Sequence, residues 1–105
     1  LNKSIISVMK EFTKEEKLKV MVRAKNILLS GNCKCMCGCI DKSLEYLSGI
    51  VINDYFYFQI LFPEFNKELA IKKFGARPYE HSYWWNDDNP KRIEYFDYLI
   101  KLYSE

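Results

Sequence analysis

The sequence is short of the residues that interrupt regular structure, and it has little excess charge. It contains only 4 glycines and 3 prolines in 105 residues, which argues against a turn-rich β-sandwich because such folds need many tight corners. One histidine cannot easily supply the ligand set of a metal-dependent nuclease or deaminase. A net charge of +2 is too small to imply binding to DNA or a membrane by electrostatics alone. The sequence also has no apolar run of transmembrane length and no signal-peptide pattern, so we expect a soluble cytoplasmic protein.

The chain is rich in side chains that build a core. Hydrophobic residues make up 49% of it and aromatic residues 16%, which excludes a disordered tail. A chain of 105 residues can bury a core without disulfides or a metal. Repeats, linkers and low-complexity segments are absent from the sequence, so we predict a single domain over residues 1–105.

The first clear helix signal begins at Thr13. Thr13 and Glu16 have the spacing of a capping box, and apolar residues then recur at helical spacing. Gly31 can take the left-handed conformation that ends a helix. We therefore predict a helix over 14–30, whereas residues 1–12 fit a short helix and a short strand equally well.

A second helix is predicted directly after the first. Asn32 is a suitable cap, and apolar residues continue at helical spacing until Gly49. We predict a helix over about 33–48, antiparallel to the first because the connection is short. Gly38 lowers the helix propensity of this segment, so we expect it to allow close approach of another backbone or of a ligand.

The middle of the chain is harder to interpret. Residues 50–62 are rich in aromatic and β-branched side chains, which favour a strand. Asn53 and Asp54 nevertheless offer a helix cap, and we predict a short helix from Asp54 to Phe62 that Pro63 stops.

A further short helix should follow. Asn66 can cap it, and Phe65 precedes the cap, where it can pack on Ala70 as a hydrophobic staple. Gly75 is expected to end this helix.

The last helix is predicted from a cap at Asn89, with Pro90 in the first helical position. Its apolar stripe consists of Ile93, Phe96, Leu99, Ile100 and Tyr103. The predicted fold is all-α: a small, compact helical bundle of about four to five helices, with an ordered aromatic loop before the last one.

Four cysteines alternate along a short stretch: Cys33, Cys35, Cys37 and Cys39. Zinc can take four sulfur ligands, but ordinary structural sites join two ligand pairs from separate parts of the chain, and this chain has one group only. On a helix, Cys33 and Cys37 would face the core and the other two would point elsewhere. We interpret the cysteines as core residues that bind no metal, with metal binding and redox chemistry as the alternatives, and we expect no disulfide in a cytoplasmic chain.

The segment between Gly75 and Arg92 is the candidate ligand site. Aromatic rings stack on flat bases and arginine pairs with phosphate, so these types suit a nucleotide-like ligand. The candidate residues are Arg77, Tyr79, His81, Tyr83, Trp84, Trp85 and Arg92. The structural alternative is that the tryptophans close the core and that Arg77 caps helix carbonyls.

The second half of the chain contains four blocks: LFPEF at Leu61–Phe65, FGAR at Phe74–Arg77, YWW at Tyr83–Trp85 and the helix from Arg92 to Ile100. This combination resembles a family of small, mostly uncharacterised proteins of bacteriophages and mobile elements. The cysteine cluster departs from the family pattern, in which this region is apolar and alanine-rich. That departure favours the core interpretation of the cysteines over metal binding.

The resemblance implies an anti-defence accessory protein in the cytoplasm of an infected bacterium. Several small phage families act as sponges, which bind the nucleotide messengers of bacterial immunity without cleaving them. We therefore expect a non-enzymatic oligomer that needs no cofactor and that sequesters an ADP-ribose derivative or a cyclic dinucleotide. The alternative is a protein-binding inhibitor of a host defence enzyme that uses the same aromatic loop. DNA binding ranks third, because basic and acidic residues are interleaved.

Overall fold

The computed structural model describes residues 12–33, 35–51, 60–74 and 89–105. The helices within these ranges are α2 (Lys14–Ser30), α3 (Met36–Ser48), α5 (Lys67–Leu69) and α6 (Asn89–Ser104), with the π-helical turn η1 (Ala70–Phe74) continuing α5. No strand occurs in the part of the chain that is described, so the predicted all-α class is confirmed. The predicted aromatic loop falls outside these ranges.

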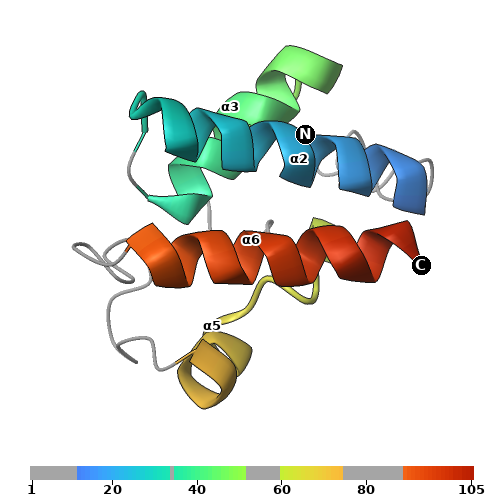
Figure 1. Ribbon diagram of the computed structural model, residues 1–105. Helices are drawn as coiled ribbons and strands as arrows, with labels where there is room; N and C mark the ends of the chain where they lie inside the picture. Colours follow the sequence, from blue (N-terminus) through green and yellow to red (C-terminus); the bar gives the residue numbers. More distant parts are fainter. Residues whose placement is uncertain (1–11, 34, 52–59, 75–88) are drawn as a thin grey trace.

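Helix α2 is the central element of the arrangement. It lies beside α6, and the two run in opposite directions (Figure 1). Two contacts fix this pairing: the Lys25 ammonium lies 2.6 Å from an Asp97 carboxylate oxygen, and the Lys14 ammonium donates to the carbonyl of Glu105 at 3.0 Å. Helix α3 also packs on α2, and η1 packs on α6. Helices α2 and α6 therefore pack against each other, with α3 on α2 and η1 on α6.

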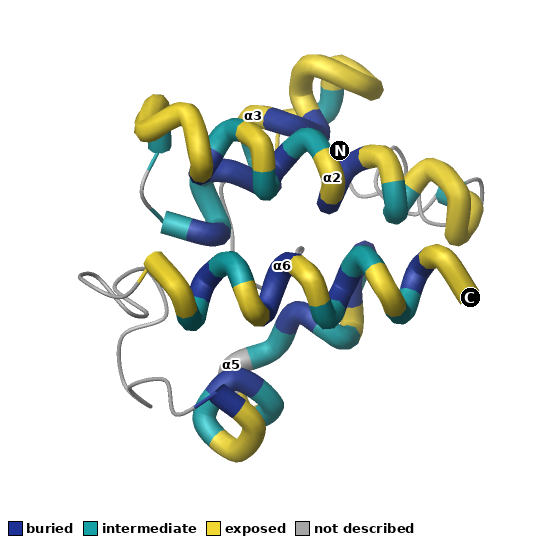
Figure 2. Tube along the Cα trace, in the orientation of Figure 1, coloured by how far each residue is buried: buried dark blue, intermediate teal, exposed yellow. Residues whose placement is uncertain are grey.

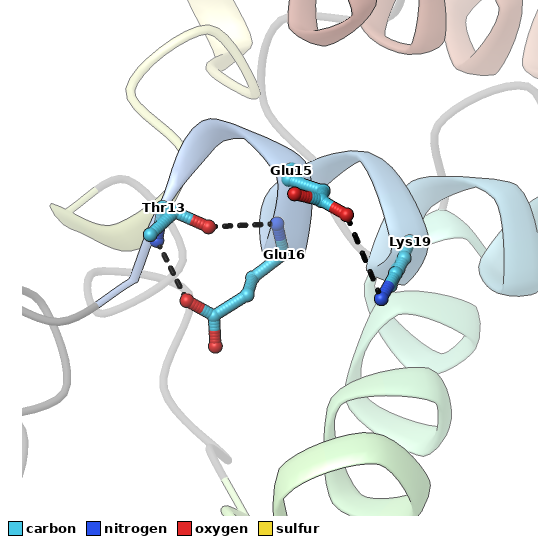
Figure 3. A network of polar contacts seen from close by, with 4 residues as sticks. All are labelled: Thr13, Glu15, Glu16 and Lys19. Atoms are coloured by element: carbon cyan, nitrogen blue, oxygen red, sulfur yellow. Dashed lines mark hydrogen bonds and ion pairs between the residues drawn. The ribbon is translucent and has the colours of Figure 1, made fainter.

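Helix α2 has the bounds and the cap that the sequence predicts. The Thr13 hydroxyl accepts from the Glu16 amide at 3.1 Å, and the Glu16 carboxylate accepts from the Thr13 amide at 3.0 Å (Figure 3). In the same turn, Glu15 and Lys19 form an exposed ion pair at 3.9 Å. At the other end Gly31 has φ 80°, a conformation that costs glycine little. Local chemistry alone thus defines both ends of this helix.

Helix α3 begins later than predicted, at Met36. Its cap is Cys35, whose sulfur accepts from the Gly38 amide at 3.2 Å, and not Asn32. The physical reason is the reversal of the chain: the residues after α2 must turn before α3 can pack back on it. The predicted end is confirmed, because Gly49 has φ 75°.

The segment before α5 agrees with the prediction where it is described. Ile60 and Leu61 are helical and the helix has ended at Phe62, directly before Pro63, while the predicted start at Asp54 lies outside the described residues. The Asn66 side-chain oxygen accepts from the amide of Leu69 at 2.7 Å, which confirms the predicted cap.

The region around the predicted staple differs in its helix type. Phe65 and Ala70 are both fully buried. The α-helix lasts only to Leu69, and the chain continues as the π-turn from Ala70 to Phe74. The predicted end at Gly75 lies outside the described residues.

Helix α6 begins at Asn89, one residue earlier than predicted. The Asn89 side-chain oxygen accepts from the Arg92 guanidinium at 2.6 Å. The buried face consists of Arg92, Tyr95, Phe96, Leu99 and Tyr103, whereas the predicted Ile93 and Ile100 are half-buried at its margin. The helix is thus rotated so that Arg92 and Tyr95 take the place of the two isoleucines in the buried stripe.

The core lies between α2, α3, α6 and the segment from Leu61 to Phe74. Figure 2 shows the buried stretches of α2 and α6 alternating with exposed ones, as expected for amphipathic helices. The largest buried hydrophobic residues in this part of the chain include Met21, Phe62, Phe65, Tyr95 and Phe96. No described helix combines the length and the apolarity needed to span a membrane.

Candidate functional site

Of the seven predicted ligand-binding residues, the structure describes one, Arg92. The other six lie outside the described residues: Arg77, Tyr79, His81, Tyr83, Trp84 and Trp85. Arg92 is on the first turn of α6 and only 2% exposed, and it donates to the Asn89 side chain. Burial raises the pKa of Cys35 and of Cys39, and the positive charge of the Arg92 guanidinium opposes that rise without reversing it. The predicted positive charge is therefore held in the interior, beside the cysteines.

The cysteines are placed differently from the prediction. Cys39 is fully buried, whereas Cys37 and Cys33 are half-buried. The prediction that Cys39 points away from the core is wrong, because α3 starts after Cys35 and the buried stripe then runs through Cys39 and Ile40. Cys33 and Cys35 precede the helix, so helical spacing does not govern them.

Cysteine side chains and backbone groups form a local network before α3. The Cys33 thiol donates to the carbonyl of Cys35 at 3.7 Å, and the Cys39 thiol donates to the carbonyl of Cys33 at 3.5 Å. Burial raises the pKa of Cys37 to about 12, and it raises the pKa values of Cys35 and Cys39 as well. Within the described ranges, no group of three or more His, Cys, Asp or Glu side chains is arranged to hold a metal ion.

A second feature lies on the outer surface of α2 and α3, which we call the α2–α3 surface. Two hollows of about 490 Å³ each adjoin there and share Arg23 and Ile27. The apolar hollow is lined by Leu18, Val22, Ile27 and Leu47, with Lys19 and Arg23 beside them. The polar hollow adds Asn32, Lys42, Glu45 and Tyr46. The surface thus places apolar walls next to a group of charged and hydrogen-bonding side chains.

Arg23 and Tyr46 form the centre of this surface. The guanidinium carbon of Arg23 lies 3.4 Å from the centroid of the Tyr46 ring, a stacked cation–π arrangement. The Nε atom of Arg23 is buried and has no hydrogen-bond partner within the described structure. Tyr46 remains 69% exposed. A guanidinium placed over an aromatic ring keeps its charge, and the face turned away from the ring can stack on a ligand.

A second positive charge lies at the edge of the polar hollow. The Lys42 ammonium donates to the carbonyl of Asn32 at 3.5 Å, and Glu45 supplies a carboxylate acceptor. Two cations with one acceptor suit a ligand that carries phosphate or carboxylate together with donor groups.

The sequence pattern does not predict Arg23 or Tyr46 as site residues. They are far apart along the chain, and only the packing of α3 across α2 brings them together. One signal was present, because Tyr46 is a large aromatic residue that falls off the apolar stripe of its helix.

Comparison of the chain with protein-family models, with curated proteins and with solved structures gave no match.

Proposed function

We propose that this protein binds a small, planar, anionic ligand of the nucleotide type and holds it without chemical turnover. The observation that carries the proposal is the Arg23 guanidinium, stacked on Tyr46 where two hollows meet. Arginine in this setting can pair with a phosphate through its edge and stack on a base through its plane.

The size and chemistry of the α2–α3 surface support this class of ligand. Small-molecule sites commonly have volumes of roughly 300–1,000 Å³ with apolar walls and a few polar groups. Each hollow here has about 490 Å³ and is broadly open to solvent. Lys42 can add to the charge of Arg23 on a phosphate, while Glu45 can accept from ribose hydroxyls or base amines.

The resemblance noted in the sequence makes immune messengers the first ligands to test. An ADP-ribose derivative or a cyclic dinucleotide carries both phosphates and flat bases. We further propose that the protein acts as an oligomer in the bacterial cytoplasm during phage infection. The residues predicted from sequence between Arg77 and Arg92 remain a second possible location for the ligand. The α2–α3 surface and this segment are therefore alternative sites for the same ligand.

The experiment is a thermal-shift panel of nucleotides, followed by calorimetry and by recovery of the ligand. A ligand at 100 times its dissociation constant adds about 2.7 kcal/mol to the free energy of unfolding. We expect one messenger class to produce such a shift and to be recovered intact. Absence of a shift across ADP-ribose compounds and cyclic dinucleotides contradicts the proposal, and recovery of a cleaved ligand would make the protein an enzyme.

Matched variants locate the site. Arg23→Gln should abolish the shift, and Lys101→Gln, which removes one charge from an exposed position on α6, should keep it. If Arg23→Gln binds normally but Arg77→Gln or Trp84→Ala does not, the ligand occupies the segment predicted from sequence. That outcome would support ligand binding as the function but would place the site in the segment from Arg77 to Arg92 and not on the α2–α3 surface.

The alternative function is that of a protein-binding inhibitor of a host defence enzyme. The observation that favours it is the exposure of large hydrophobic residues on α2, on α3 and directly after α3: Val22, Leu29, Tyr46, Leu47 and Val51. Tyrosine and arginine are also enriched in interaction hot spots. A purified defence enzyme that forms a stoichiometric complex with the wild type, but not with Tyr46→Ala, would establish this function.

A further inference from the structure

We propose that Cys33 and Cys35 form a binding site for a soft monovalent metal ion, with Cu(I) as the ion to test. The two cysteines precede α3, and their sulfur atoms gather around Gly38. A Cβ atom at position 38 would lie 2.5 Å from the Cys33 sulfur and 3.0 Å from the Cys35 sulfur. Both sulfurs are therefore near one point, and the missing side chain of Gly38 provides the space.

The backbone places a hydrogen-bond donor next to the Cys35 sulfur. The Cys35 sulfur caps α3 and accepts from the Gly38 amide at 3.2 Å. Burial raises the pKa of Cys35, and the Gly38 N–H opposes that rise. An N–H donor at the positive end of a helix dipole favours the thiolate, which is the form that binds metals.

The surrounding charge suits an ion with a single positive charge. When Cu(I) binds, two S–H bonds break, two protons leave to solvent and two Cu–S bonds form, with no electron transferred. Two thiolates and one Cu(I) leave a net charge of −1. The guanidinium of Arg92, which is only 2% exposed and also donates to Asn89, contributes positive charge that acts on Cys35. A buried ionic group is favourable only when its charge is compensated in this way.

The donor set favours a soft ion over zinc. Thiolates bind both Cu(I) and zinc, but a structural zinc site takes four ligands arranged as a tetrahedron, and this pair supplies two. In the described residues no third side chain joins the two sulfurs in a geometry that could complete such a site. The fully buried Cys39 thiol donates to the carbonyl of Cys33 and interacts with the Cys33 side chain, so it lies next to the site.

The test uses the reduced 105-residue chain under anaerobic conditions, titrated with Cu(I) against a colorimetric Cu(I) chelator. We expect the protein to take one equivalent, with protection of two of its four thiols from a thiol reagent. Cys33→Ser and Cys35→Ser should each weaken binding by about tenfold or more. Cys37→Ser is the matched control, because it removes a thiol from the same short stretch, and it should retain the full equivalent.

Gly38→Ala provides a variant that keeps all four cysteines. Its methyl group would lie too close to the Cys33 sulfur and would displace it, so we expect weaker Cu(I) binding while circular dichroism shows an unchanged helix content. The proposal is overturned if the wild type takes no Cu(I) from the chelator. It is also overturned if both Cys33→Ser and Cys35→Ser still take one equivalent, or if Zn(II) displaces the bound Cu(I) at equal concentration.

Discussion

The hydroxyl of Tyr95 in α6 accepts a hydrogen bond at 3.0 Å from the backbone amide of Asn66, the residue that caps α5. The same hydroxyl donates to the carbonyl of Glu64 at 2.7 Å. The Tyr95 ring stacks on Phe74 of η1, with the ring centroids 4.7 Å apart. One side chain of α6 thus holds both the start and the end of the α5–η1 segment.

Tyr95→Phe should destabilise the protein by about 1–3 kcal/mol, because it leaves buried backbone groups with fewer partners. Urea unfolding followed by circular dichroism measures the change. Tyr98→Phe is the control, since Tyr98 is half-buried and packs on the same Phe74 ring. Equal effects of the two substitutions would contradict the role assigned to the Tyr95 hydroxyl.

Ser43→Ala should also destabilise the protein, by about 1 kcal/mol. The fully buried Ser43 hydroxyl donates to the carbonyl of Val20 at 2.7 Å and so connects α3 to α2. Ser48→Ala is the matched control, because its hydroxyl bonds to the carbonyl of Leu44 within the same helix. Thermal unfolding of both variants should show the larger loss for Ser43→Ala, and the reverse order would argue against this interhelical contact.

Thr13→Ala removes half of the capping box of α2 and should cost about 1 kcal/mol. The loss is expected because the Glu16 amide no longer has the hydroxyl acceptor seen in Figure 3. Ser104→Ala, at the exposed end of α6, should change the free energy of unfolding much less. Chemical denaturation of the two variants compares them directly, and a Thr13→Ala variant as stable as the wild type would show that the cap contributes nothing.

Alkaline pH should destabilise the fold. Burial, followed by the neighbouring Cys35, raises the pKa of Cys37 from 9.0 to about 12. The folded state therefore keeps this proton where the unfolded chain loses it, so the stabilisation is complete below pH 9 and is lost as the pH rises toward 12. Burial and the Glu64 carboxylate likewise raise the pKa of Tyr103 from 10.0. Its titration therefore adds to the loss of folding stability above pH 10.

Urea unfolding across this pH range measures the effect. The free energy of unfolding should fall steadily above pH 9, and Cys37→Ser should show a shallower fall. Tyr103→Phe serves as a second comparison, because it should change the dependence only above pH 10. A free energy that stays constant to pH 11 would show that these groups titrate alike in both states.

The sequence by itself determined the class of fold and most helix ends. The capping box of Thr13, the left-handed glycines at Gly31 and Gly49 and the cap at Asn66 all stand as predicted. These features depend on bonds between residues a few positions apart, so they can be recognised without knowing the rest of the structure.

Only the tertiary structure decided which side chains meet. The burial of Cys39 and Arg92, the stack of Arg23 on Tyr46 and the grouping of two sulfurs around Gly38 all depend on how the helices are rotated and where α3 starts. Helical spacing fixes the faces of one helix relative to each other, but the partner of each face is set by packing between helices distant in sequence. That is why the α2–α3 surface was found from the fold and not from a motif.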